Sequence, residues 1–316
     1  MGQLANRDSM HYPRPLEVSG HYSALLIGLE ISGQDRMSYG FHKKRLDKFV
    51  KLYEANSLAS QSLKKRMATA VEPIKAQIRK NGVFDTKAII DIFPDEGMTR
   101  DQLQHFIAKQ PTRIAILAIL CWGHISAKSL RGYLLSSEDS IKEFENYVIW
   151  LKKSNPTRAA AYEKIAAMRK GTQRQHWRLQ GVGVAYFTKV IFFFTRSSKK
   201  PGYIMDQFTA RSTNFLLDAK IIKMDSGTVV TDRNSKDNYE AFCGCVEALA
   251  SIVGEAKNKR VMPEQIEMAM FSGRSGKWRS YLTVSDEAGL KKKKKNNKTT
   301  TNKTPAKKST PKKTMI

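Results

Sequence analysis

The chain has 316 residues, of which 41 % are hydrophobic, so it is long enough to bury one large core or two modest ones. Its 55 Lys and Arg residues against 29 Asp and Glu give a net charge of +26, which favours a polyanionic partner such as a nucleic acid. No apolar run approaches the ~18 to 20 residues of a membrane-spanning helix, so we expect no membrane partner. Charge alone leaves open a ribosomal role or a merely solvated basic surface.

Part of the positive charge is concentrated in the last residues. The segment 291–316 contains eleven lysines and no acidic residue, so the remaining 290 residues still carry +15. Because this tail has almost no apolar residues, we expect it to be disordered and to add salt-sensitive affinity for DNA. The N-terminus lacks the basic and then apolar order of a signal peptide, and we expect a cytoplasmic protein.

Most of the chain has apolar residues at three-to-four spacing, which is typical of amphipathic helices. Residues 99–102 read T-R-D-Q, a capping-box pattern that predicts the start of a helix. The polar stretch 224–238 predicts a loop with room for a short hairpin. The sequence therefore predicts a mainly α protein, with helices in the segments 42–56, 57–81, 100–110, 112–135, 138–153, 156–170, 239–253 and 263–271.

The most informative stretch is 172–217, in which two predicted helices are separated by the residues L-Q-G-V-G. Two glycines around one apolar residue let the backbone turn tightly and leave no side chain to block a close approach. Amides at the start of the next helix favour an anion, so the hairpin can hold a DNA phosphate without reading sequence. A plain tight turn is the alternative. The candidate phosphate-binding residues here are Gln180, Gly181, Val182 and Gly183.

An aspartate follows this hairpin at the start of another predicted helix. The predicted helix after the hairpin, which ends near Thr195, is followed by a basic loop with Lys199 and Lys200, then by the apolar residues 203–205 and by Asp206. The helix that begins there carries Arg211, which with the two lysines is a further candidate for contact with the DNA backbone. An aspartate at a helix start is most simply an N-cap. It can also be a partly buried carboxylate that the helix amides keep ionised.

The order of these features resembles the catalytic core of helix-hairpin-helix DNA glycosylases. Residues 183–189 (G-V-A-Y-F-T-K) and 204–206 (I-M-D) are most similar to the bacterial 8-oxoguanine-glycosylase-like branch, and 263–271 is similar to its C-terminal helix. The resemblance implies a helix-hairpin-helix glycosylase fold, with two helical lobes flanking a cleft. It also implies a double-stranded DNA partner, a monomer, and a monovalent cation held by hairpin carbonyls of Leu179–Gly183.

With this resemblance, the chain divides into four parts. Residues 1–99 form an N-terminal helical region, and residues 100–222 form the helix-hairpin-helix catalytic lobe. Residues 223–290 form a C-terminal helical segment that packs on the core, and 291–316 are the lysine-rich tail. No metal site is expected, because the chain has only three cysteines and its six histidines are scattered.

The resemblance assigns the role of catalytic carboxylate to Asp206. Breaking an N-glycosidic bond develops positive charge on the sugar, and a fixed carboxylate stabilises that charge and orients a water. Glycosylases that also cut the strand have, two residues after the second hairpin glycine, a lysine that forms a Schiff base. Here that residue is Ala185, so we predict a monofunctional enzyme that leaves an abasic site. Lys189, one helical turn later, is the second candidate catalytic residue, either as a phosphate contact or as an amine.

The target base must leave the DNA helix to reach Asp206, so the protein needs a pocket for a flipped base. Aromatic and apolar side chains would line it, although each candidate is better explained as a core or surface residue. The leading candidates are Tyr203, Phe208, Trp122 and Trp278, followed by His124, Trp177, Phe271 and Tyr281.

The resemblance leaves the biological setting open. One setting is defence, in which the enzyme excises glucosylated hydroxymethylcytosine from phage DNA, and the other is repair of 8-oxoguanine or alkylated bases. We favour defence, because Ala185 argues against the standard oxoguanine role and a basic tail suits an enzyme that patrols foreign DNA. A hypothesis of another class is a non-catalytic DNA-binding protein that uses the hairpin for phosphate contact alone.

Overall fold

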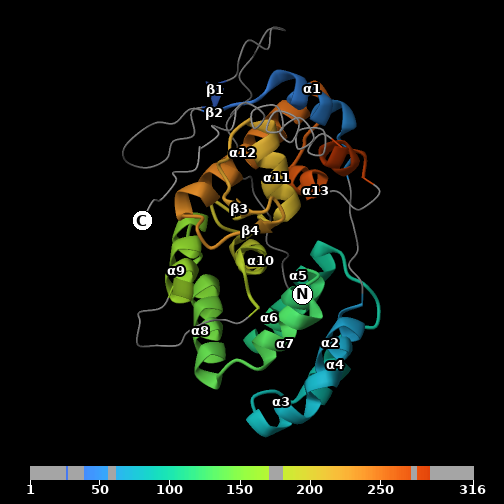
Figure 1. Cartoon of the computed structure of the whole chain (residues 1–316), viewed down its shortest axis with the longest axis vertical. Helices are drawn as coiled ribbons and strands as arrows, with labels where there is room; N and C mark the ends of the chain where they lie inside the picture. Colours follow the sequence, from blue (N-terminus) through green and yellow to red (C-terminus); the bar gives the residue numbers. More distant parts are fainter. Residues whose placement is uncertain (1–25, 28–38, 56–61, 171–180, 272–275, 285–316) are drawn as a thin grey trace, which may run out of the picture.

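The computed structural model describes residues 26–27, 39–55, 62–170, 181–271 and 276–284, and these are mainly helical (Figure 1). The prediction of a mainly α protein is confirmed. The helices are, in chain order, α1 (Lys43–Leu52), α2 (Leu63–Val71), the 3₁₀ turn η1 (Glu72–Ile74), α3 (Lys75–Asn81), α4 (Thr86–Ile92), α5 (Arg100–Ala108), α6 (Thr112–Trp122), α7 (Ala127–Leu134), α8 (Glu138–Ser154), α9 (Arg158–Lys170), α10 (Val184–Thr195), α11 (Gln207–Leu216), α12 (Lys236–Ala256) and α13 (Pro263–Phe271).

Strands in the described residues are confined to two short antiparallel pairs. In the first pair, β1 (Leu26–Ile27) pairs with β2 (Tyr39–Gly40). In the second, β3 (Met224–Asp225) pairs with β4 (Val229–Val230), with Met224 opposite Val230. The second pair confirms the short hairpin predicted within 224–238.

Local sequence sets most helix boundaries as predicted. The capping box at the start of α5 is present, with the Gln102 amide donating to Thr99 Oγ1 and the Thr99 amide donating to Gln102 Oε1 at 2.7 Å. The segment 112–135, predicted as one helix, is instead divided into α6 and α7. His124 at the break has a φ of +57°, which a continuous helix does not allow. The short helix α4 was not predicted from the spacing of apolar residues.

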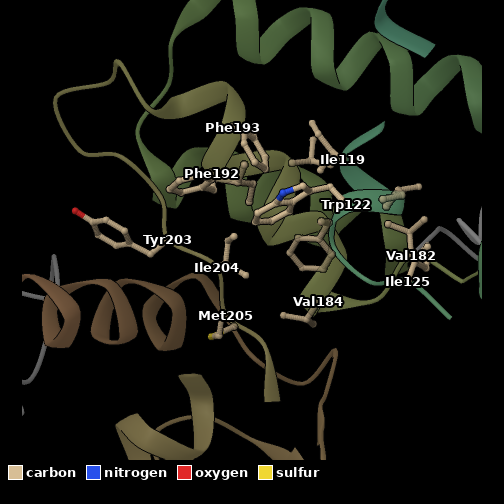
Figure 2. Packing of buried hydrophobic residues seen from close by; sticks show 14 of the residues in the cluster. Ile119, Trp122, Ile125, Val182, Val184, Phe192, Phe193, Tyr203, Ile204 and Met205 are labelled. Carbon is tan, nitrogen blue, oxygen red and sulfur yellow. The ribbon is translucent and has the colours of Figure 1, made fainter. Parts of the chain in front are cut away.

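Helix α10 runs through the middle of the structure (Figure 1), and its sequence VAYFTKVIFFFT is buried at nearly every position. It packs against α6, α8 and α9. Trp122 at the end of α6 meets the Phe193 ring edge-on, with 5.3 Å between centroids, and Figure 2 shows it within a cluster of side chains from α6, α10 and the segment 203–205. Each such buried aromatic side chain contributes about 1.5 to 3 kcal/mol.

Two groups of helices lie on opposite sides of α10 (Figure 1). Helices α2 to α8 form one group, in which α2 packs on α6 and α7, while α11, α12 and α13 pack together in the other. Helix α1 packs on α11, so the N-terminal region contributes to both groups. The division at residues 99 and 222 remains a prediction, and the lysine-rich tail 291–316 lies outside the described residues. Within the described ranges, every helix is too short or too polar to cross a membrane.

Candidate active site

A cavity of about 810 Å³ lies where the two groups of helices meet α10. Its wall is formed by parts of α2, α5, α6, α10, α11 and α13 and by the β3–β4 hairpin. Four cations and two carboxylates line it, so the wall carries an excess of positive charge, which favours a nucleic acid. The charged residues on the wall are Arg66, Arg100, Lys189, Asp206, Glu267 and Arg279.

The predicted glycine hairpin forms one edge of this cavity. Gly181 has a φ of +78°, and a Cβ placed there would lie 1.9 Å from the Ser129 carbonyl oxygen, so the hairpin backbone packs directly on α7. Gly183 is the N-cap of α10 and itself lines the cavity. The first amides of a helix lack partners within it, so the start of α10 offers donors to an anion.

The carbonyl of Val182 accepts a hydrogen bond from Arg169, which also pairs with Asp232 at 2.6 Å. A cationic side chain therefore already binds one hairpin carbonyl. Leu179 and Gln180, predicted to complete a cation site and a phosphate contact, lie outside the described residues.

The buried segment 203–205, which leads to Asp206, is held by hydrogen bonds on two sides. The hydroxyl of Thr188 in α10 accepts the Met205 amide at 3.2 Å, and the hydroxyl of Tyr239 in α12 donates to the Tyr203 carbonyl at 2.8 Å. Gly202 is required for this close packing, because a Cβ there would lie 2.6 Å from the Tyr239 hydroxyl. These contacts hold the segment rigidly against α10 and α12.

Asp206 is the N-cap of α11, as its position predicted, and it also lines the cavity. Its Oδ1 accepts the amides of Phe208 at 2.8 Å and Thr209 at 3.0 Å. The Thr209 hydroxyl accepts the Asp206 amide at 2.9 Å and completes a capping box. Both helix amides bind Oδ1, so capping engages one carboxylate oxygen and leaves Oδ2 for another role. The side chain is only 7 % exposed.

Lys189 lies on the cavity wall one turn along α10. Its stem folds back towards the start of the helix, as helical side chains do, and Nζ donates to the Ala185 carbonyl at 2.8 Å. A Cβ at Gly123 would lie 2.4 Å from Lys189 Cδ, so this glycine makes room for the stem. Burial, with a smaller contribution from Arg100, lowers the pKa of Lys189, while Asp206 and Glu267 oppose the shift.

A buried ion pair lies on the same wall. Arg100 Nη2 and Glu267 Oε2 are 2.6 Å apart, and the Glu267 side chain is only 1 % exposed. Burial raises the pKa of Glu267 to about 7, against the opposing effect of Arg100, and the negative charge of Asp206 adds to the rise. The Arg100 guanidinium also lies 4.8 Å from the centroid of Phe192. The wall therefore contains a carboxyl group that changes charge near neutral pH.

At the break between α6 and α7, His124 meets Arg66 from α2, with 2.5 Å between Arg66 Nη2 and His124 Nδ1. Burial, reinforced by the positive charges of Arg66 and Lys189, lowers the pKa of His124 to about 4. The imidazole is therefore neutral at physiological pH, and its Nδ1 accepts a hydrogen bond from the guanidinium. This contact brings the N-terminal region into the cavity.

Aromatic rings form the apolar part of the wall. Phe208 and Phe271 meet edge-on with centroids 5.9 Å apart, and the Arg279 guanidinium lies 3.4 Å from the Phe208 centroid. Trp122 also lines the cavity and donates its indole N–H to the Met98 carbonyl. Phe208 and Trp122 therefore lie on the cavity wall, together with His124 and Phe271 from the wider set of candidates, and their contact with a flipped base stays a prediction.

The structure does not bring Tyr203 and Trp278 to this wall. The Tyr203 hydroxyl bonds to Glu247 at 3.3 Å, and Figure 2 shows its ring pointing away from Trp122. Trp278 is buried and donates to Ser212 Oγ at 2.9 Å. Both are core residues, because each side chain is satisfied within the protein. Tyr281 packs on Trp278 away from the cavity, and position 177 lies outside the described residues.

The residues predicted to contact the DNA backbone lie away from the cavity wall. Lys199 and Lys200 are exposed in the turn after α10, at the opposite end of that helix from the hairpin. Because α10 has 12 residues, this is a distance of about 18 Å. Arg211 lies one turn into α11, outside the cavity wall. Contact of these three residues with DNA stays a prediction.

Residues 63–271 match the family model described as "Putative 8-oxoguanine DNA glycosylase OGG-like protein". The chain belongs to this DNA glycosylase family. The match covers the hairpin, Asp206 and all of α13. Nearly all residues that line the cavity of this OGG-like glycosylase therefore lie within the matched range. No curated protein and no solved structure matches the chain significantly. Among the described residues, no cluster of three or more His, Cys, Asp or Glu is arranged to hold a metal ion.

Three charged residues of the cavity were missed by sequence reasoning: Arg66, Arg100 and Glu267. Arg66 and Arg100 are two of 55 basic residues, and nothing in the sequence distinguishes them. Glu267 had a signal, since it is an acidic residue in the otherwise apolar run 266–271.

Proposed function

We propose that the protein is a monofunctional DNA glycosylase, acting as a monomer on double-stranded DNA, in which Asp206 is the catalytic carboxylate. One observation carries the proposal: Asp206 is held at the cavity wall with its Oδ1 bound to two helix amides, while no hydrogen bond to its Oδ2 is found among the described residues. A carboxylate fixed before the reaction costs no reorganisation when positive charge develops beside it.

In the proposed reaction, the target nucleotide leaves the duplex and its base enters the cavity between Trp122, Phe208 and Phe271. The bond between the base and C1′ breaks, and the electron pair leaves with the base. Asp206 stabilises the positive sugar and accepts a proton from the water that attacks C1′. The departing base takes up a proton, and an abasic site remains.

Lys189 bears on whether the strand is also cut. Ala185 occupies the position of the lyase lysine, and the Lys189 amine is bound to the Ala185 carbonyl. We assign Lys189 to positioning and charge stabilisation beside Asp206. A second candidate activity is strand cleavage through this amine, and the lowered pKa of Lys189 favours it, because a neutral amine is the nucleophilic form.

For the substrate, we propose a base that carries a bulky polar substituent, such as glucosylated hydroxymethylcytosine in phage DNA. A volume of about 810 Å³ is near the upper end of small-molecule sites, which leaves room beyond a bare base. Charged groups such as Arg100 and Glu267 suit hydroxyl-rich substituents. Repair of 8-oxoguanine or alkylated bases is the alternative.

A panel of duplexes tests the proposal, each containing one of 8-oxoguanine, alkylated purines, uracil, hydroxymethylcytosine and its glucosylated form. Incubation is followed by gel analysis with and without alkali, for the wild type and for Lys189→Met. Cleavage that needs alkali supports the monofunctional enzyme, and the cleaved duplex identifies the base. Cleavage without alkali that Lys189→Met abolishes establishes the lyase. Tight DNA binding with no cleavage of any duplex favours the non-catalytic binding protein.

A further inference from the structure

The ion pair on the cavity wall has buried polar atoms that the described part of the chain leaves without a hydrogen-bond partner. Glu267 Oε2 lies 2.6 Å from Arg100 Nη2, but this contact lacks the alignment of a hydrogen bond, and Oε2 has no other partner. The same holds for Nε and Nη1 of Arg100, whose side chain is 10 % exposed. Buried polar atoms in native proteins are nearly always paired. These atoms on a cavity wall therefore indicate a ligand that hydrogen-bonds to this pair.

The position of the pair is next to the rings that the proposed function places against the base. Glu267 lies one helical turn before Phe271 on α13, so the two side chains are neighbours on one face of the helix, and both line the cavity. The Arg100 guanidinium lies 5.9 Å from the centroid of Trp122, which lines the cavity as well. A base held by these rings would therefore be within reach of the Glu267 carboxyl group.

The two carboxyl groups of the wall have unlike surroundings. Asp206 accepts two amides at the start of α11, where a negative charge is stabilised. Glu267 is instead buried, which raises its pKa to about 7, and the negative charge of Asp206 adds to the rise. Surroundings that separate the protonation states of two carboxyl groups in one site are typical of a catalytic base and a catalytic acid.

We propose that Glu267 is the general acid of the reaction, which donates its proton to the departing base while Asp206 acts on the sugar and the water. This inference rests on the proposed function, in which the base must take up a proton as it leaves. The bond between the base and C1′ breaks, its electron pair stays on the base, and the proton of the Glu267 carboxyl group moves to a nitrogen or oxygen of the base. Asp206 accepts the proton of the attacking water. Arg100 stabilises the carboxylate that remains at Glu267, and proton exchange with solvent restores both groups.

The test is the pH dependence of single-turnover excision, measured from pH 5 to pH 9 on the duplex of the panel that the wild type cleaves. The variant is Glu267→Gln, which keeps the shape of the side chain but has no acidic proton to donate. The matched control is Glu264→Gln, which changes a glutamate of the same helix whose ion pair with Arg196 lies outside the cavity wall. Urea unfolding at each pH shows that all variants are folded.

The charged groups that face Glu267 come from three other elements. They are Arg100 from α5, Lys189 from α10 and Asp206 at the start of α11. Arg100 opposes the rise in the pKa of Glu267, and Lys189 is itself a buried group that titrates on this wall. The profile is therefore also measured for Arg100→Gln and Lys189→Met.

We expect the rate of the wild type to fall above about pH 7, because the proton donor is lost there. Glu267→Gln is expected to be about 100- to 10,000-fold slower at pH 6 and to lose this fall, while Glu264→Gln matches the wild type. Arg100→Gln is expected to move the fall to higher pH, which a purely structural role of the ion pair would not do. Lys189→Met is expected to keep the fall in rate.

The outcomes separate this proposal from the proposed function. If the wild type excises a base and Glu267→Gln keeps its rate and pH profile, the general acid is refuted and the glycosylase stands. A slower Glu267→Gln in which the fall in rate persists also overturns the proposal, because the titrating group then lies elsewhere, and loss of the fall in Lys189→Met would identify it as Lys189. If the wild type cleaves no duplex of the panel, the proposed function itself fails, and the general acid fails with it.

Discussion

Glu267 makes the stability of the protein depend on pH in a way that one substitution removes. The carboxyl group is buried on α13 against Arg100, and burial raises its pKa from 4.5 to about 7. Between these two values, the folded protein binds a proton that the unfolded chain has released. The contribution of Glu267 to stability is therefore complete below pH 4.5 and is lost as the pH rises to about 7.

Each unit of pKa shift corresponds to about 1.36 kcal/mol, so the shift of Glu267 corresponds to roughly 3 kcal/mol in all. Glu267→Gln keeps the shape of the side chain and removes its titration. Replacing the neutral carboxyl group by an amide shifts the variant's stability by a similar amount at every pH. The difference between the wild type and the variant must therefore change by roughly 2 to 3 kcal/mol from pH 5 to pH 8, in favour of the variant at pH 8.

Urea unfolding of both proteins at pH 5 and pH 8 measures this difference. Comparing the two proteins cancels every group that titrates identically in both. An equal difference at both pH values would refute the reasoning, since it would mean that burial does not raise the pKa of Glu267. A change in favour of the wild type at pH 8 would mean that folding lowers the pKa of Glu267 instead of raising it.

Two further predictions concern the elements around the site. Gly181→Ala puts a Cβ 1.9 Å from the Ser129 carbonyl at a φ of +78°, so we expect a loss of at least about 3 kcal/mol in urea unfolding, while Gly183→Ala meets nothing within 4 Å and serves as its control. Equal effects of the two alanines would contradict the packing of the hairpin on α7. Arg158→Met removes the buried partner of Glu240 and Glu247, whose side chains are 23 % and 38 % exposed, and is expected to cost about 1.5 to 3 kcal/mol by the same measurement. A loss below about 1 kcal/mol would show that this ion pair does not support the fold.

The fold was predictable from sequence where local chemistry determines it. Apolar periodicity found most helices, and the capping pattern at Thr99 marked the start of α5 within a residue. The break between α6 and α7 was missed, because Trp122 and Ile125 keep an apolar spacing across it, while the backbone leaves the helix at His124 and is extended at Ser126. Helix α4 is seven residues long, too short for periodicity to reveal.

The site was predictable only in part, for a related reason. Asp206 and the glycine hairpin lie close together in one stretch of sequence, so their order alone indicated their association. Arg66 and Glu267 reach the same cavity from segments 200 residues apart, and only tertiary packing brings them there. Among the aromatic candidates, residue type did not distinguish Phe208 on the cavity wall from Trp278 in the core, because both environments favour large apolar rings.

The most direct test of the central claim is the single-turnover excision rate of Asp206→Asn. Asparagine caps a helix as well as aspartate does, so this substitution removes the charge and keeps the start of α11. We expect the rate on the cleaved duplex to fall by at least about 100-fold, with urea unfolding unchanged and with unchanged affinity for a duplex that contains a tetrahydrofuran abasic analogue. An Asp206→Asn protein that excises the base at the wild-type rate would contradict the account.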